Sequence, residues 1–228
     1  MKRRIITTAD GSKTIQIEDW NEQYHSVHGA INEAKHVFIK YGLQHVFNSY
    51  KSKDDSHPIS LLEIGFGTGL NAFLTLLETE KAQHPINYVG VEAYPVSPQE
   101  IEALNYVELV APAQTNLFNK LHHIAWNSPY DLTNFFKLTK RQMYFKELSD
   151  VNAYDLVYFD AFGARVQPEL WTEEVFKSMF KALKPNGVLV TYAAKGSVRR
   201  AMQAVGFIVE RLDGPPGKRE MLRATKSL

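Results

Sequence analysis

The sequence predicts an α/β protein built on a mostly parallel, doubly wound sheet. Short apolar segments alternate with segments of helical periodicity along most of the chain, a pattern typical of a parallel sheet covered by helices on both faces. A glycine-rich turn directly follows one apolar segment, and acidic residues end two others. Because ligands of such sheets bind at the carboxyl ends of the strands, these residues mark the edge where a site is expected.

The elements follow in order along the chain. A hairpin is expected within residues 1–20, because isoleucines flank a turn-forming segment (Ile5, Ile6, Ile15 and Ile17). Ser97 should begin a helix, since Pro98 and Glu100 follow at favourable positions. The other expected helices are 30–47, 70–77, 171–183 (stopped by residues 185–187) and 197–204. The expected core strands are 61–64, 88–92, 153–160, 187–192, 207–210 and a C-terminal antiparallel strand from about 220.

Composition limits the class of protein. The chain has 228 residues, 44% of them hydrophobic, and no cysteine, so it predicts neither disulfides nor a thiolate site. We expect one globular unit, with an N-terminal extension (1–55) packed on a core domain (56–228). No segment approaches the ~18 apolar residues of a membrane span, and the start lacks the apolar stretch of a signal peptide. A soluble cytoplasmic protein is therefore expected, and the oligomeric state is left open.

The glycine-rich turn carries the most information. A dinucleotide fingerprint requires Gly-x-Gly-x-x-Gly, but here Leu70 stands at the last position and the third glycine comes at Gly69. The spacing from Glu63, Glu-x-Gly-x-Gly-x-Gly, resembles the first motif of S-adenosylmethionine (SAM)-dependent methyltransferases, which implies their Rossmann-like fold. Glu92 ends the next strand 23 residues after Gly69, near the ~20 expected for an acid that binds ribose hydroxyls. The alternative is a structural turn followed by an exposed glutamate.

Asp160 ends the strand 153–160 and should lie over the same edge. Its alternative role is a helix cap or solvated turn. With this aspartate, the expected cofactor-binding residues are Glu63, Gly65, Phe66, Gly67, Gly69, Asn71, Glu92, Ala93 and Asp160.

Several segments together resemble the methyltransferase domain of the MnmC family. They are the stretch from Asp160 to Thr172, the stretch 196–207 with 217–222, and the N-terminal stretch 24–39. The resemblance implies methyl transfer from SAM to the 5-aminomethyl group of a tRNA wobble uridine, often 2-thiolated, in the form that lacks the flavin-dependent oxidoreductase domain. The family's short Gly-Asp pair is missing near residues 140–145, so the partner of the adenine amino group stays open among Gln142, Glu147 and Asp150.

If the acceptor is an amine, one carboxylate can supply the proton transfer that it needs. An alkyl ammonium has a pKa of about 10.4 and is not nucleophilic, so Asp160 is expected to act as catalytic base.

From residue 193 onward the chain has eight basic and three acidic residues. This surplus of positive charge suits a phosphate backbone as well as an ordinary solvated face. The expected substrate-binding residues are Tyr24, His25, Glu33, Phe162, Arg199, Arg200, Lys218 and Arg219. No metal site is expected, because no histidine cluster has ligand spacing.

Two other functions stay open on the sequence alone. The chain could be a small-molecule amine or polyamine group-transfer enzyme on the same fold, or a non-catalytic SAM- or RNA-binding module. The basic residues from 193 onward favour an RNA partner over a small-molecule acceptor. The presence of both Glu92 and Asp160 argues against a non-catalytic module.

Overall fold

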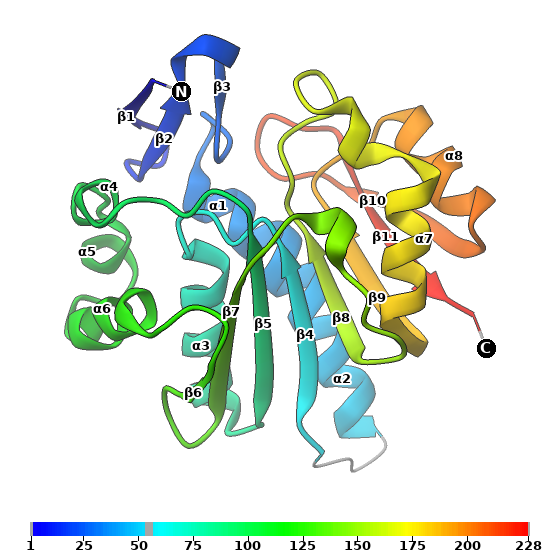
Figure 1. Ribbon diagram of the computed structural model, residues 1–228. Helices are drawn as coiled ribbons and strands as arrows, with labels where there is room; N and C mark the ends of the chain where they lie inside the picture. The colour runs from blue at the N-terminus through cyan, green and yellow to red at the C-terminus, as the bar shows by residue number, and fades with distance from the viewer. Residues whose placement is uncertain (1, 53–56, 228) are drawn as a thin grey trace.

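The computed structural model describes residues 2–52 and 57–227. An eight-stranded sheet forms its centre, with the strand order β10-β11-β9-β8-β4-β5-β7-β6. These strands are β4 (Ile59–Ile64), β5 (Ile86–Glu92), β6 (Pro129–Asp131), β7 (Phe136–Gln142), β8 (Tyr154–Phe159), β9 (Leu183–Thr191), β10 (Phe207–Asp213) and β11 (Glu220–Lys226). Figure 1 shows the sheet with its helices on either side.

Most of the sheet is parallel. β4 pairs in parallel with β5 and β8, β5 with β7, and β8 with β9. β11 runs antiparallel to both β9 and β10, and the short β6 is antiparallel to β7 at the other edge. The predicted mostly parallel sheet with a C-terminal antiparallel strand is thus confirmed.

Helices cover both faces, which confirms the doubly wound arrangement. The helical segments are η1 (Glu18–Trp20), α1 (Ala30–Ala34), the π-helix η2 (Lys35–Leu43), α2 (Gln44–Ser52), α3 (Leu70–Ala82), α4 (Pro98–Glu102), α5 (Tyr106–Val110), η3 (Pro112–Gln114), α6 (Thr115–His123), η4 (Phe145–Glu147), η5 (Pro168–Trp171), α7 (Glu173–Ala182) and α8 (Gly196–Ala204). Leu61 packs in a core with α3 and the helix containing Phe38, whereas its neighbour Leu62 packs with α7 and α8 on the other face. This alternation follows from the two-residue period of a strand.

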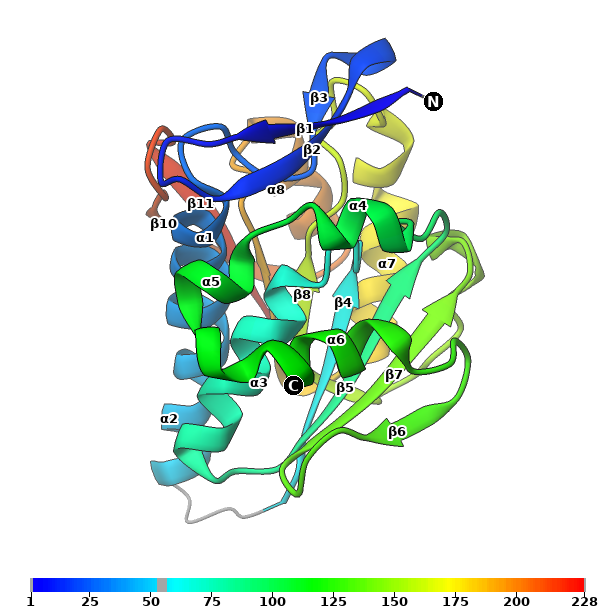
Figure 2. The same cartoon turned by 90° about the vertical axis from the view of Figure 1, so that its left-hand side faces the viewer.

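A separate three-stranded sheet precedes the core. It consists of β1 (Arg3–Thr7), β2 (Lys13–Ile17) and β3 (Glu22–Gln23). The predicted hairpin is confirmed, since Ile5 pairs with Ile15 in antiparallel register. Figures 1 and 2 show this sheet above the carboxyl ends of the central strands.

Several predicted boundaries were wrong, and those at the starts of α7 and β9 have a clear local cause. The helix expected from Trp171 begins at Glu173, because the tryptophan belongs to the 3-10 turn η5 and Thr172 caps the helix. The strand expected from Gly187 begins at Leu183. Its turn-forming residues lie inside β9 as an irregularity, where Asn186 adopts a positive φ of 64° and the pairing with β8 shifts register. Such a bulge absorbs Pro and Gly that would otherwise interrupt a strand.

The predicted division between residues 55 and 56 falls outside the described residues and stays a prediction. Among the helices of residues 2–52 and 57–227, we find none that is both long and apolar enough to pass through a bilayer.

Candidate active site

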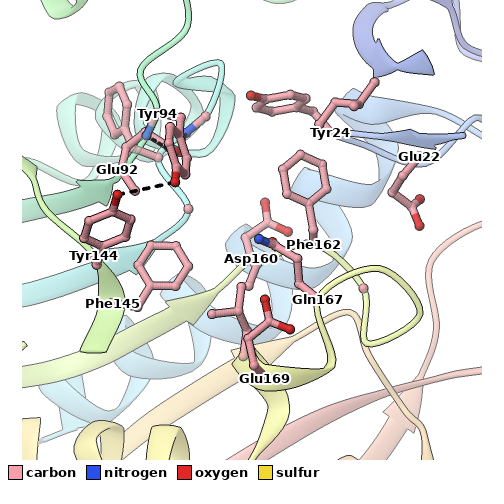
Figure 3. A pocket seen from close by; sticks show the side chains of 18 of the residues that line it. Glu22, Tyr24, Glu92, Tyr94, Tyr144, Phe145, Asp160, Phe162, Gln167 and Glu169 are labelled. Carbon is pink, nitrogen blue, oxygen red and sulfur yellow. Dashed lines mark hydrogen bonds between the residues drawn. The ribbon is translucent and has the colours of Figure 1, made fainter. Parts of the chain in front are cut away.

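A cavity of about 560 Å³ opens at the carboxyl ends of β4, β5 and β8, beneath the N-terminal sheet. Its volume is in the range of small-molecule sites. Figure 3 shows Asp160 between two groups of side chains: Glu92, Tyr94, Tyr144 and Phe145 on one side, and Tyr24 and Phe162 on the other. Of the predicted residues, those that line the cavity are Tyr24, His25, Gly65, Phe66, Gly67, Asn71, Glu92, Ala93, Asp160 and Phe162.

The glycine turn brings two strand ends together. The amides of Gly65 and Phe66 both donate to the carbonyl of Val91 at 3.0 Å. Gly65 has a φ of +90°, and a Cβ there would lie 2.6 Å from the backbone oxygen of Asp160. Only glycine therefore lets the turn after β4 approach the loop after β8.

Gly69 has a different environment. It does not line the cavity, and a Cβ on it would lie 2.8 Å from the ring of His122 on α6. Its positive φ of 71° starts α3. The structure therefore gives Gly69 a packing role, and its contact with a cofactor stays a prediction.

Glu92 braces the turn from the end of β5. One carboxylate oxygen accepts a hydrogen bond from the amide of Gly67 at 3.0 Å, and the other accepts from the amide of Tyr94 at 3.0 Å. The carboxylate also lines the cavity. It is thus fixed by backbone donors while facing the space where a ligand would lie.

Asp160 is linked to a second, deeper carboxylate. The side-chain amide of Asn71 donates to Asp160 Oδ2 and to Glu63 Oε1, both at 2.9 Å. Glu63 also accepts from the Tyr88 hydroxyl at 2.7 Å and is completely buried. Glu63 therefore anchors Asn71 from below rather than lining the cavity, whereas Asp160 keeps part of its surface open to it.

The surroundings of Asp160 bring the pKa of its carboxyl group close to neutral pH. Burial raises the pKa of Asp160 to about 7, and the negative charge of Glu33 acts in the same direction. The hydrogen bond from Asn71 and the positive charge of Lys218 oppose that rise in pKa. Burial also raises the pKa of Glu63 well above its ordinary value. A general base is most effective when its pKa lies close to the working pH.

The predicted substrate-binding residues that line the cavity, Tyr24, Phe162 and His25, have two different roles in the structure. Tyr24 and Phe162 meet edge to face, with ring centroids 4.9 Å apart, and both border the cavity. His25 is tied to Thr14 by a hydrogen bond of 2.9 Å and approaches Thr68 at 3.5 Å. Burial lowers the pKa of His25 to about 4, so it is neutral at pH 7 and joins the hairpin to the glycine turn.

The remaining predicted substrate residues do not line the cavity. Glu33 and Lys218 form an ion pair with each other, and the arginines Arg199, Arg200 and Arg219 lie outside. All three arginines belong to segments at the carboxyl edge of the sheet: α8 follows the end of β9, and residues 214–219 connect β10 to β11. They are therefore at the same edge as the cavity but not in it.

Five aromatic residues that line the cavity were not predicted from the sequence: Trp20, Tyr94, Tyr144, Phe145 and Tyr192. Tyr94 and Tyr144 are about half exposed, and their hydroxyls lie 3.4 Å apart (Figure 3). A usable signal was available for these two tyrosines, since each follows the end of a parallel strand by two residues. By contrast, none of the adenine-contact candidates lines the cavity: Asp150 is held by Arg141 at 2.8 Å, Glu147 accepts from the amide of Tyr144, and Gln142 lies just before the lining residues.

No group of three or more His, Asp or Glu side chains in the described parts of the chain is arranged to hold a metal ion.

Comparisons with known proteins agree with this geometry. Residues 133–227 match a family model described as S-adenosyl-L-methionine-dependent methyltransferase. A protein of Leptospira interrogans named tRNA 5-methylaminomethyl-2-thiouridine biosynthesis bifunctional protein MnmC is 28% identical over 90% of this chain and 32% of its own length. The protein of the same name from Leptospira borgpetersenii is 27% identical over 89% of this chain and 32% of its own. The chain thus spans about a third of the length of these curated relatives.

The same fold occurs in a solved structure. The crystal structure of MnmC2 from Aquifex aeolicus superposes with a TM-score of 0.78 at 24% identity, covering 99% of this chain and 70% of that one. The family model over residues 133–227 and the curated relatives support a SAM-dependent methyltransferase, and the solved structure shows the same fold. Within that class, the predicted resemblance to MnmC is confirmed over nine-tenths of the chain.

Proposed function

We propose that this protein methylates the nitrogen of a 5-aminomethyl group on the wobble (2-thio)uridine of tRNA, giving 5-methylaminomethyl-(2-thio)uridine. The observation that carries this proposal is Asp160, a carboxylate with a raised pKa in the wall of the cavity. The names of the Leptospira relatives support a tRNA 5-methylaminomethyl-2-thiouridine product.

The cavity fits SAM in three respects. A carboxylate, Glu92, faces it beside the glycine turn, where ribose hydroxyls need an acceptor. The turn at Gly65 and Gly67 has no side chains that would fill the space, and Tyr94 and Tyr144 offer aromatic surface for a purine. Bound SAM supplies an activated methyl group on a sulfonium. In this proposal the cofactor is held by Gly65, Phe66, Gly67, Glu92 and Ala93.

Asp160 prepares the acceptor amine. The amine arrives mostly as an ammonium ion, with a pKa of about 10, and a neighbouring carboxylate attracts it. Asp160 then takes one proton from the ammonium, which frees the lone pair on nitrogen and leaves the carboxyl neutral until it returns the proton to water. The partly buried aspartate is suited to both steps because it opens to the cavity on one side and is hydrogen-bonded to Asn71 on the other.

A small cationic amine is the second candidate acceptor. Glu22, Glu169 and Glu174 also line the cavity, and this acidic lining would attract a polyamine as readily as an aminomethyl group. The basic segments at the cavity edge favour the tRNA, because a polyamine would be repelled by them.

The acceptor can be identified by mass spectrometry. Undermethylated tRNA carrying 5-aminomethyl-uridine is incubated with SAM bearing a deuterated methyl group, with spermidine present as a competitor. The proposal expects the label in 5-methylaminomethyl-uridine after nuclease digestion and none in spermidine. Label in spermidine alone would establish the second candidate, and label in neither would contradict amine methylation.

A further inference from the structure

One ion pair joins the two ends of the chain beside the active site. Lys218 Nζ lies 2.5 Å from Glu33 Oε2, across 185 positions of sequence. The Glu33 side chain is only 8% exposed and the Lys218 side chain 30%. The second oxygen of Glu33 accepts from the amide of Ser26 at 3.1 Å. A buried carboxylate with two partners of this kind is costly to leave unpaired.

The connection that carries Lys218 is fitted closely to the N-terminal segment. Gly217 has a φ of +81°, and a Cβ on it would collide with the ring of His28. A side chain at this position would have to displace the His28 ring and adopt an unfavourable positive φ, so the connection and the N-terminal segment are in close contact here. The placement of the lysine is thus a consequence of packing and does not depend on a flexible side chain alone.

Lys218 also contacts the wall of the cavity. Its Nζ lies 3.8 Å from the centre of the Tyr192 ring. The hydroxyl of Tyr192 donates to the carbonyl of Ala161 at 2.8 Å, and Ala161 directly follows Asp160. Tyr192 lines the cavity, whereas Lys218 and Glu33 do not. One aromatic ring thus connects the ion pair to the backbone of the Asp160 loop.

Lys218 supplies the positive charge in an acidic neighbourhood. The ionisable groups that act on Asp160 or feel its charge are Glu33 on α1, Glu63 on β4, Tyr88 on β5, Tyr192 after β9 and Lys218 between β10 and β11. Lys218 is the single cation in this set, counted over the described residues. Without it, the charge of Glu33 would act on Asp160 uncompensated.

We propose that Lys218 and Glu33 are positioning residues for the reaction: the pair holds Tyr192 against the Asp160 loop and balances the charge around Asp160. The pair acts through Asp160 and does not touch the substrate. The inference rests on the proposed function only in making Asp160 the base. It replaces the substrate-binding roles that the sequence analysis expected for both residues.

The test is a titration of Asp160 in Lys218→Met, Glu33→Gln and the double variant. Carboxyl ¹³C NMR follows the aspartate signal that Asp160→Asn removes, and circular dichroism confirms that each variant folds. Loss of the cation should move the Asp160 titration to higher pH, and loss of the Glu33 charge to lower pH. In the double variant Asp160 should titrate at a pH between those of the two single variants. Lys218→Arg should titrate as the wild type does. A shift of one pH unit would change the rate on the acidic limb about tenfold.

The matched control is Lys226→Met. Lys226 also lies over an aromatic ring, Phe180, and donates to the Leu183 carbonyl at 2.7 Å, but it is at the opposite end of β11. It should leave the Asp160 titration unchanged. The proposal is overturned if Asp160 titrates in Lys218→Met and Glu33→Gln as it does in the wild type.

The pH dependence of methyl transfer separates this inference from the proposed function. If the Asp160 titration and the pH–rate profile shift together, both stand. If the carboxyl titration shifts while the pH–rate profile does not, the charge-balancing role of the pair stands and Asp160 is not the base.

Discussion

Asp160 holds its carboxyl group where a negative charge is unfavourable. Burial and the nearby Glu33 raise the pKa of Asp160 to about 7, whereas an unfolded chain would show an ordinary aspartate pKa of about 3.9. The folded state therefore binds more protons than the unfolded state between these two pH values. Stability contributed by the protonated carboxyl is present at low pH and is lost as pH rises through about 7.

This loss of stability with rising pH leads to a prediction for a variant without the charge. Asp160→Asn removes the charge and can still accept the Asn71 hydrogen bond through its amide oxygen. At about pH 8 the variant should unfold a few degrees above the wild type, and at about pH 5 the difference should shrink. Thermal unfolding followed by circular dichroism at the two pH values measures this. A variant less stable than the wild type at the higher pH would mean that the carboxylate is well stabilised where it lies.

Glu92 allows a direct test of the cofactor site. Glu92→Ala removes an acceptor for ribose hydroxyls and also releases the amides of Gly67 and Tyr94. SAM binding measured by calorimetry should weaken by about 1.5–3 kcal/mol, the value of a hydrogen bond to a charged group. Glu102→Ala on α4 is the control, because Glu102 is exposed and outside the cavity. Equal affinities for the two variants would remove Glu92 from the site.

At this scale the sequence was informative where a residue's role depends on its position in a strand. Glu92 ends the parallel strand β5 and Asp160 directly follows the parallel strand β8, so both could be placed at the cavity in advance. The role of Glu63 could not, because its partners Tyr88 and Asn71 come from two other elements. The pairing of Glu33 with Lys218 was equally inaccessible, since the two residues are 185 positions apart.

Among the elements, the N-terminal sheet is held to the loop after β8 by Arg165 and by aromatic contacts of Phe162. Arg165, in the loop after β8, donates to the carbonyls of Trp20 and Asn21 at 3.1 and 3.0 Å and to Glu22 at 3.0 Å. Phe162 in the same loop packs edge to face on Trp20, with ring centroids 5.7 Å apart. The loop that carries Asp160 thus also holds the cover of the cavity.

Loosening this cover should affect the acceptor more than the cofactor. Arg165→Ala should raise the KM for the acceptor several-fold and change SAM affinity less than twofold, because the glycine turn and Glu92 do not depend on Arg165. Steady-state kinetics and calorimetry measure the two effects. Arg4→Ala is the control, since Arg4 contacts Gln16 and Glu18 within the N-terminal segment. The same KM from both variants would contradict a covering role for the sheet.

Local sequence predicted element types better than their ends. The Ser97 start of α4 was confirmed in detail, with a capping box formed by Glu100. The beginning of β9 was missed because pairing with β8 overrides the turn tendency of residues 185–187. The π-helix η2 also had no sequence signal, since its apolar spacing resembles that of an α-helix.

For the molecule as a whole, the strand topology determines which arginines of the C-terminal region form ion pairs and which do not. Arg211 and Arg223 are paired with Glu220 and Glu210 on the neighbouring strands β11 and β10. Arg200 and Arg219 are exposed at the carboxyl edge, and neither forms an ion pair with any described residue. Exposed positive charge that is free of ion pairs with described residues is therefore present at the edge where the cavity opens.

This arrangement predicts how tRNA binding depends on salt. The Arg200→Ala/Arg219→Ala variant should bind more weakly and reduce the slope of log affinity against log salt by about 0.7–0.9 for each lost phosphate contact. Filter binding over a salt series gives the slope. Lys177→Ala/Lys181→Ala on α7 removes the same charge from outside the cavity lining and should leave the slope closer to that of the wild type. Identical slopes for both variants would contradict an RNA surface at this edge.

The central claim is that Asp160 deprotonates an amine for methyl transfer, and the pH dependence of a single turnover tests it most directly. Wild-type protein and Asp160→Asn are mixed with undermethylated tRNA at saturating SAM, from about pH 6 to about pH 9. The wild-type rate should rise with pH and level off above about pH 7, in line with the raised pKa of Asp160. The variant should be about 10²–10⁴-fold slower near pH 7 and keep rising with pH as free amine becomes available. A variant within a few-fold of the wild type near pH 7, with the same profile, would contradict the claim.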